Sequence, residues 1–180
     1  MIFFTKTNES GEIMSVNMYR KIRDDLDLSR ETVSDLSYKY GFSISDDILT
    51  RIENGIRPIQ PEEVLLLSKI YKNPILCNYH CSNECPIGKQ YVPEVKLKDL
   101  QAIALETVAS LNTVETKKNR LIDISVDGMI QPDEIKDFIN IQNELERISI
   151  TVETLQIWVE KMLADGSIDL KLYNKIKNEG

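Results

Sequence analysis

The sequence predicts an all-α protein with an N-terminal bundle of four or five helices followed by a long antiparallel helical hairpin. Residues 28–58 hold two short helical patterns separated by a glycine turn, which indicates a helix-turn-helix. Residues 96–124 and 132–164 hold longer patterns with apolar residues every three or four positions, which indicates a coiled-coil-like pair of helices. With 180 residues, 42% of them hydrophobic, the chain has room for one domain and a substantial second module.

Four parts are expected along the chain. A polar leader covers residues 1–13, a helix-turn-helix domain covers 14–75, a cysteine-containing connector covers 76–94 and a dimerisation hairpin covers 95–180. Met14 stands directly before the first helical pattern and is a second candidate for the start of the protein.

The charge and composition favour a DNA-binding or interaction protein over an enzyme. A net charge of −7 argues against a nonspecific polyanion binder but leaves room for a local basic face. The single histidine and the lack of a glycine-rich phosphate loop or a nucleophile elbow speak against catalysis. The apolar runs are too short for a membrane span and no signal peptide is apparent, so we expect a cytoplasmic protein without a membrane partner.

The two short helices carry their own start and stop signals. Ser29 is a predicted N-cap, and Gly41 is expected to end the first helix. Ser45 can cap the second helix, whose first turn holds Asp46 and Asp47 where the helix dipole favours acids. Asparagine and glycine at positions 54 and 55 tolerate the backbone conformations common at helix ends. A further helix starts at Pro61 with two glutamates behind it and closes the bundle.

Residues 49–58, with their Ile-Glu-Asn-Gly run, resemble the end of the recognition helix and the exit turn in the lambda-repressor-like (XRE) helix-turn-helix family of bacterial and phage regulators. The resemblance covers about a third of the chain, residues 18–74, and implies a repressor that binds a palindromic operator in double-stranded DNA. We expect phosphate contacts from three arginines and base contacts from three residues at the start and middle of the helix, with one asparagine at its end: Arg30, Arg51 and Arg57; Ser45, Asp46 and Thr50; and Asn54.

Two departures from that family keep a second interpretation open. The segment between Ser29 and Leu49 is longer than the family's usual spacing, and Asp46 and Asp47 would lie near phosphates. A protein-interaction adaptor or antirepressor that retains the helix-turn-helix scaffold would explain such an acidic face. For Arg51 the plain alternative is a salt bridge to Asp47, one turn back, and for Asn54 it is helix capping alone.

A cluster of cysteines follows the bundle. Cys77, Cys81 and Cys85 are spaced by four, and His80 lies among them, which is the residue set of a closed zinc site. Structural zinc sites usually draw ligands from two separated pairs, so packed reduced thiols are the main alternative and redox sensing is a third.

Residues 123–134 match the calcium loop of an EF-hand at its key positions. Asp123, Ser125, Asp127 and Glu134 would supply oxygen ligands around the turn at Gly128. The plain alternative is a glycine turn followed by a proline-started helix with capping acids.

The hairpin is expected to pack along two apolar seams and to pair with a second copy, because a lone hairpin leaves much apolar surface in water. The predicted seam of the first helix comprises Leu97, Leu100, Ala104, Leu111, Val114 and Leu121. The predicted seam of the second helix, which we assign to the homodimer, comprises Phe138, Ile141, Leu145, Ile148, Val152, Leu155, Val159 and Met162.

Overall fold

The structure, a computed structural model, describes residues 6–7, 13–14 and 17–179 and divides into two compact units, Met1–Tyr91 and Val92–Gly180. Most of the expected leader lies outside the described residues. Strand β1 (Lys6–Thr7) and strand β2 (Ile13–Met14) form a short antiparallel pair in which Lys6 lies opposite Met14. All other regular elements of the described chain are helices, which confirms the all-α class.

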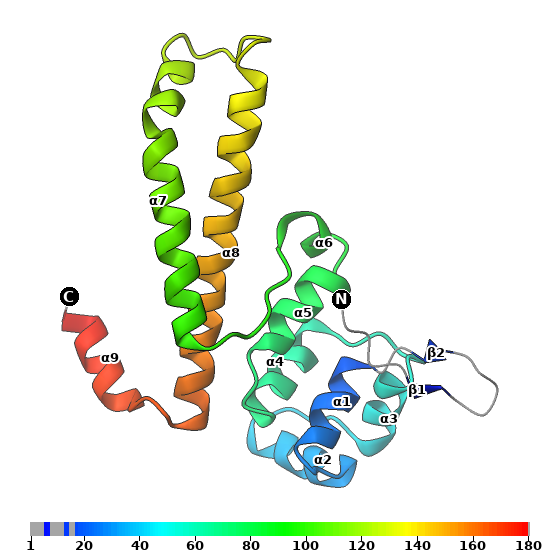
Figure 1. Ribbon diagram of the computed structural model, residues 1–180. Coiled ribbons are helices and arrows are strands. Elements are labelled where there is room, and N and C mark those ends of the chain that lie inside the picture. Colours follow the sequence, from blue (N-terminus) through cyan, green and yellow to red (C-terminus); the bar gives the residue numbers. More distant parts are fainter. Residues whose placement is uncertain (1–5, 8–12, 15–16, 180) are drawn as a thin grey trace. The chain divides into compact units, whose positions relative to one another are not determined.

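The first unit is a set of short helices whose starts are fixed by local capping (Figure 1). The side chains of Asn17, Ser29 and Ser45 each accept a hydrogen bond from a backbone N–H in the first turn of the helix that follows. Gly41 and Gly55 have φ values of 75° and 69°, a conformation that glycine adopts without strain. The helices are α1 (Met18–Asp25), α2 (Arg30–Lys39), α3 (Asp46–Glu53), α4 (Pro61–Ile70), α5 (Ile75–Asn83) and α6 (Gly88–Tyr91).

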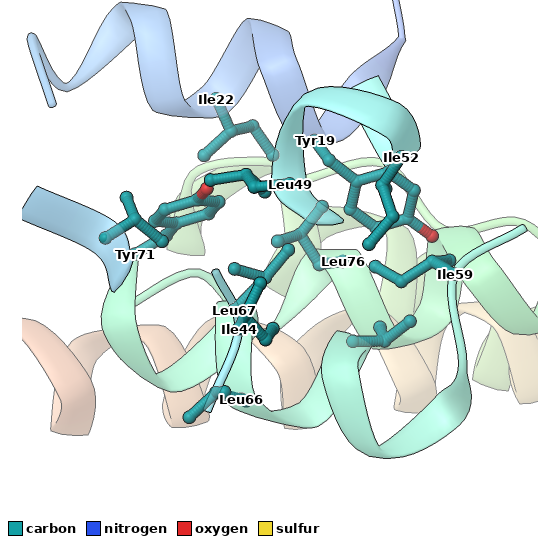
Figure 2. Packing of buried hydrophobic residues seen from close by; sticks show 12 residues of the cluster. Tyr19, Ile22, Ile44, Leu49, Ile52, Ile59, Leu66, Leu67, Tyr71 and Leu76 are labelled. Atoms are coloured by element: carbon teal, nitrogen blue, oxygen red, sulfur yellow. The ribbon is translucent and has the colours of Figure 1, made fainter. Parts of the chain in front are cut away.

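One apolar cluster forms the core of this unit, and α1 to α5 all contribute to it (Figure 2). Helix α4 contributes most, because its sequence is apolar on several sides. The buried members are Tyr19, Ile22, Val33, Ile44, Leu49, Ile52, Ile59, Val64, Leu66, Leu67, Tyr71 and Leu76.

The segment predicted as a connector, residues 76–94, belongs largely to this first unit. Leu76 is fully buried in the core, and α5 packs against α4. Gly88 lies against α5, where an added Cβ would overlap the carbonyl oxygen of Cys81. The boundary between the units falls after Tyr91, because α5 and α6 have apolar and close backbone contacts that a linker would lack.

The second unit is built on two long helices, α7 (Leu100–Ser125) and α8 (Ile135–Asp165), followed by α9 (Leu170–Glu179). The long helices lie side by side and antiparallel (Figure 1). Arg120 Nε donates to Asp137 Oδ2 at 2.8 Å and Lys117 Nζ donates to the carbonyl of Asn140 at 3.5 Å, which sets their register. No helix in the described ranges has the length and apolarity needed to span a lipid bilayer.

The contact between the long helices follows the predicted seams only in part. Val114 and Leu121 of the predicted α7 seam lie beside Ile141 of α8, but other seam residues do not face the neighbouring helix. Ile103, Ser110 and Ile124 are buried on α7, whereas Leu100 and Leu111 of the predicted seam are 47% and 54% exposed. On α8 the prediction was right at Ile141, but Leu145, Val152 and Leu155 are exposed, and the buried positions also include Thr151, Thr154 and Ile157. Each long helix has more than one apolar stripe, so periodicity alone could not select the stripe that faces the partner helix.

Candidate nucleic-acid interface

Helix α3 is anchored on one side and exposed on the other. Leu49 and Ile52 lie in the core, with exposed fractions of 0% and 2%. Ser45 caps the helix, since its Oγ accepts a hydrogen bond from Ile48 N at 3.3 Å. Asp46 and Asp47 in the first turn are exposed, as is Arg51 one turn later, and Thr50 is half-buried.

A buried ion network fixes the C-terminal end of α3. The side chain of Glu53 is fully buried, and its two oxygens accept from Arg23 Nε at 2.6 Å and Nη2 at 2.9 Å. Arg30 Nε donates to the same carboxylate at 2.8 Å. The hydrogen bonds to Glu53 raise the pKa of Arg23, so its guanidinium stays charged although it is largely buried. Glu53 therefore ties α3 to α1 and to the start of α2.

A second ion pair fixes the chain that leaves α3. Arg57 Nη1 donates to both oxygens of Glu63, at 2.9 and 2.8 Å. Glu63 Oε2 also accepts from the backbone N–H of Gln60 at the start of α4. The hydrogen bond to Glu63 raises the pKa of Arg57. This arrangement holds the exit turn against α4.

The predicted DNA-contacting residues thus fall into two groups. Arg30 and Arg57 are engaged by glutamates and keep 28% and 30% of their side chains exposed. Asn54 is the C-cap of α3, as the plain alternative supposed. Among the described residues no ion pair joins Arg51 to Asp47, so the alternative of a salt bridge at Arg51 is not what the structure shows.

An open hollow of about 560 Å³ lies between the starts of α2 and α3. Its lining brings Arg30 and Asp46 together from two helices, and the remaining lining residues are Arg23, Ser29 and Glu31. The N-termini of both helices carry partial positive charge, which offsets the two acids in this hollow.

Arg23 and Glu53 are the residues of this region that the sequence prediction missed. Glu53 stands four residues after Leu49 and next to Ile52, and Arg23 stands four residues after Tyr19. Charged residues at these core-facing positions were the available signal, because charges are almost never fully buried unless paired.

The cysteine segment lies on α5 and just beyond it. The side chains of Cys77, Cys81 and Cys85 are of intermediate exposure. His80 Nδ1 lies 2.9 Å from Glu84 Oε2, which also accepts from the Tyr19 hydroxyl at 2.8 Å. Burial and, secondarily, the bond to Glu84 raise the pKa of Tyr19. His80 is therefore part of a link between α5 and α1.

Three of the four candidate calcium ligands between α7 and α8 make local hydrogen bonds. Asp127 accepts from the backbone N–H of Met129 at 3.0 Å, which lowers the pKa of its carboxyl. Glu134 accepts from the backbone N–H of Gln131, and the Ser125 hydroxyl donates to the carbonyl of Ile122. The glycine turn of the plain alternative is present at Gly128, whereas α8 begins three residues after Pro132 and its N-cap Glu134 makes no side-chain capping hydrogen bond.

Within the part of the chain that the structure describes, no three His, Cys, Asp or Glu residues are grouped so that they could hold a metal ion. Zinc at the cysteines and calcium at residues 123–134 stay predictions of the sequence.

A scan against protein-family models finds no match, and neither do searches of curated proteins and of solved structures.

Proposed function

We propose that this protein is a transcriptional regulator that represses by occupying a palindromic DNA operator, with α2 and α3 acting as a helix-turn-helix. The observation that carries the proposal is that α3 is fixed on one side and exposed on the other. Its inner side is held by the core and by Glu53, while its outer side offers Asp46, Asp47 and Arg51.

The fixed position of α3 matters because recognition of DNA bases requires side chains in defined positions. An α-helix with its side chains is about 10–12 Å across, which suits a major groove about 12 Å wide. The N-terminal residues of a recognition helix contact base edges. Here those residues are Ser45 and Asp46, and a carboxylate can accept a hydrogen bond from cytosine N4.

Among the arginines, Arg51 is the best placed to contact a phosphate. It is exposed, and none of the ion pairs found among the described residues involves it. Arg30 and Arg57 must share their guanidinium groups with glutamates, so we assign them supporting phosphate contacts. Two α3 helices related by a two-fold axis would enter the major groove about one helical turn apart, or a multiple of it.

The test is enrichment of duplex DNA from a random library by the full chain at low salt, followed by titrations. Arg51→Ala should weaken binding to all sequences and reduce the slope of log K against log salt by about one unit. Thr50→Ala should instead alter the preference among sequences. Arg147→Ala, which removes an arginine from α8 with a 65% exposed side chain, is the matched control and should leave DNA binding unchanged. Failure to enrich any sequence would contradict the proposal.

The second candidate function, an adaptor or antirepressor that binds a protein, is favoured by the exposed pair Asp46 and Asp47. Replacing both with asparagine separates the two functions. If the carboxylates read cytosine, sequence preference is lost; if they only repel phosphates, nonspecific affinity rises. A variant that gains nonspecific affinity, together with a wild-type chain that enriches no sequence, would favour the protein partner.

A further inference from the structure

We propose that a second copy of this chain covers one exposed side of the hairpin, so that two hairpins form a four-helix bundle. The open face, as we call it, consists of Leu100, Val108 and Leu111 on α7 and Leu145, Val152 and Leu155 on α8. These six side chains are between 37% and 58% exposed. They include five residues of the seams that periodicity selects, and these five are exposed in the single chain.

Helix geometry places both halves of the open face on the same side of the hairpin. Leu111 follows directly after the buried Ser110, and Val108 follows directly after Thr107, which is half-buried and lies about one turn before Ser110. Leu145, Val152 and Leu155 likewise follow directly after Glu144, Thr151 and Thr154, which face inward. A step of one residue turns each right-handed helix by 100°, and in an antiparallel pair this turn points both sets of side chains to the same side.

The distribution of charge along the hairpin favours burial of the open face. Residues 100–112 and 148–159 hold only two charged side chains among 25 residues, Glu106 and Glu153. Residues 113–125 and 135–147, at the other half of the hairpin, hold ten among 26. The register set by the hydrogen bond between Arg120 and Asp137 continues along the antiparallel pair, so the two segments with little charge lie beside each other. Charged residues are depleted at the cores of protein interfaces, so the half with little charge, which holds every residue of the open face except Leu145, is the half to be covered.

The hairpin also buries little apolar surface by itself. Ser110, Thr151 and Thr154 occupy buried positions between or beside its helices, where a self-sufficient pair would carry apolar residues. The open face exposes on the order of 500 Å² of apolar surface, near the apolar share of the roughly 800 Å² that each partner of a standard interface contributes. A second copy is the occupant that the proposed operator binding also requires, because a palindrome is read by two related copies.

The inference extends the proposed function but is tested without DNA, so that either can fail alone. Sedimentation equilibrium of the full wild-type chain should give twice the 20.7 kDa chain mass. Val108→Asp combined with Val152→Asp should raise the dissociation constant of the dimer by about 100-fold or more, since carboxylates would be buried without partners. Both positions are about half-exposed in the single chain, so the hairpin itself should keep its helical circular dichroism.

The matched control is Ile122→Asp combined with Ile139→Asp. These isoleucines are 56% and 47% exposed and also follow inward positions, but they lie in the half of the hairpin with many charges. The control should remain dimeric. A wild-type chain that is monomeric, or a control that dissociates as far as the open-face variant, would overturn the proposal. If the aspartates unfold the hairpin, Val108→Ser with Val152→Ser provides a milder variant that must still weaken the dimer.

Discussion

The two units of this protein treat their apolar residues in opposite ways. The first unit buries twelve large hydrophobic side chains and leaves eight exposed, whereas the second buries five and leaves sixteen exposed among the described residues. A buried ion network in the first unit also fixes the position of α3. We infer that the first unit is complete as a single chain and that the second would gain stability from additional apolar contacts, because small domains with little core are only marginally stable. Three variants test this difference.

The largest effect is expected at the ion network of the first unit. Glu53→Gln should lower the free energy of unfolding by about 3–5 kcal/mol, because the Arg23 guanidinium would remain buried without this counterion. Six of the seven tyrosines lie in the first unit and the only tryptophan, Trp158, lies in the second. Urea unfolding followed by tyrosine near-ultraviolet circular dichroism should shift, while unfolding followed by Trp158 fluorescence should not.

Glu62→Gln is the control for this change, since Glu62 is exposed at the start of α4. It should alter stability by no more than about 0.5 kcal/mol. Equal shifts in the tyrosine and tryptophan signals of Glu53→Gln would contradict the independence of the two units.

A somewhat smaller effect is expected at the junction between core and cysteine segment. Leu76→Ala should cost the first unit about 2–5 kcal/mol, because Leu76 is fully buried and its removal leaves a cavity. Leu105→Ala on α7, where the side chain is 73% exposed, should change stability little. Thermal unfolding of both variants checks the pair. An unaffected Leu76→Ala variant would return residues 76–94 to the status of a linker.

The smallest effect, and of opposite sign, is expected inside the second unit. Thr151→Val and Thr154→Val together should stabilise it by about 1 kcal/mol, because methyl groups would replace hydroxyls at buried positions. The two hydroxyls bond only to carbonyls of their own helix, those of Arg147 and Ile150, which lose little. Unfolding followed by Trp158 fluorescence measures the gain. Thr116→Val, at an exposed position with the same kind of bond, is the control and should show no gain in stability. A loss of stability in the variant at Thr151 and Thr154 would contradict the expectation that apolar side chains pack better at these buried positions.

Local signals in the sequence determined where the helices begin and end. Ser29 and Ser45 cap helices as predicted, Pro61 starts α4, and the long helices expected over 96–124 and 132–164 are found at Leu100–Ser125 and Ile135–Asp165. Caps, turns and apolar periods depend on residues within about one helical turn of each other, so they can be read without knowing the fold. Asp46 and Asp47 likewise lie exposed in the first turn of α3, the turn in which the sequence predicted them.

Only the tertiary structure decided which residues meet across longer distances. It paired Glu53 with Arg23, 30 residues away, and thereby assigned Arg30 to an ion network rather than to a free basic surface. It drew α5 into the first core and chose the stripe through Ile103 and Ser110, not the one through Leu100 and Leu111, as the contact of α7 with α8. Periodicity ranks the stripes of a helix by apolarity, but which stripe meets another helix depends on how both chains and copies pack together, which is a property of the assembled structure.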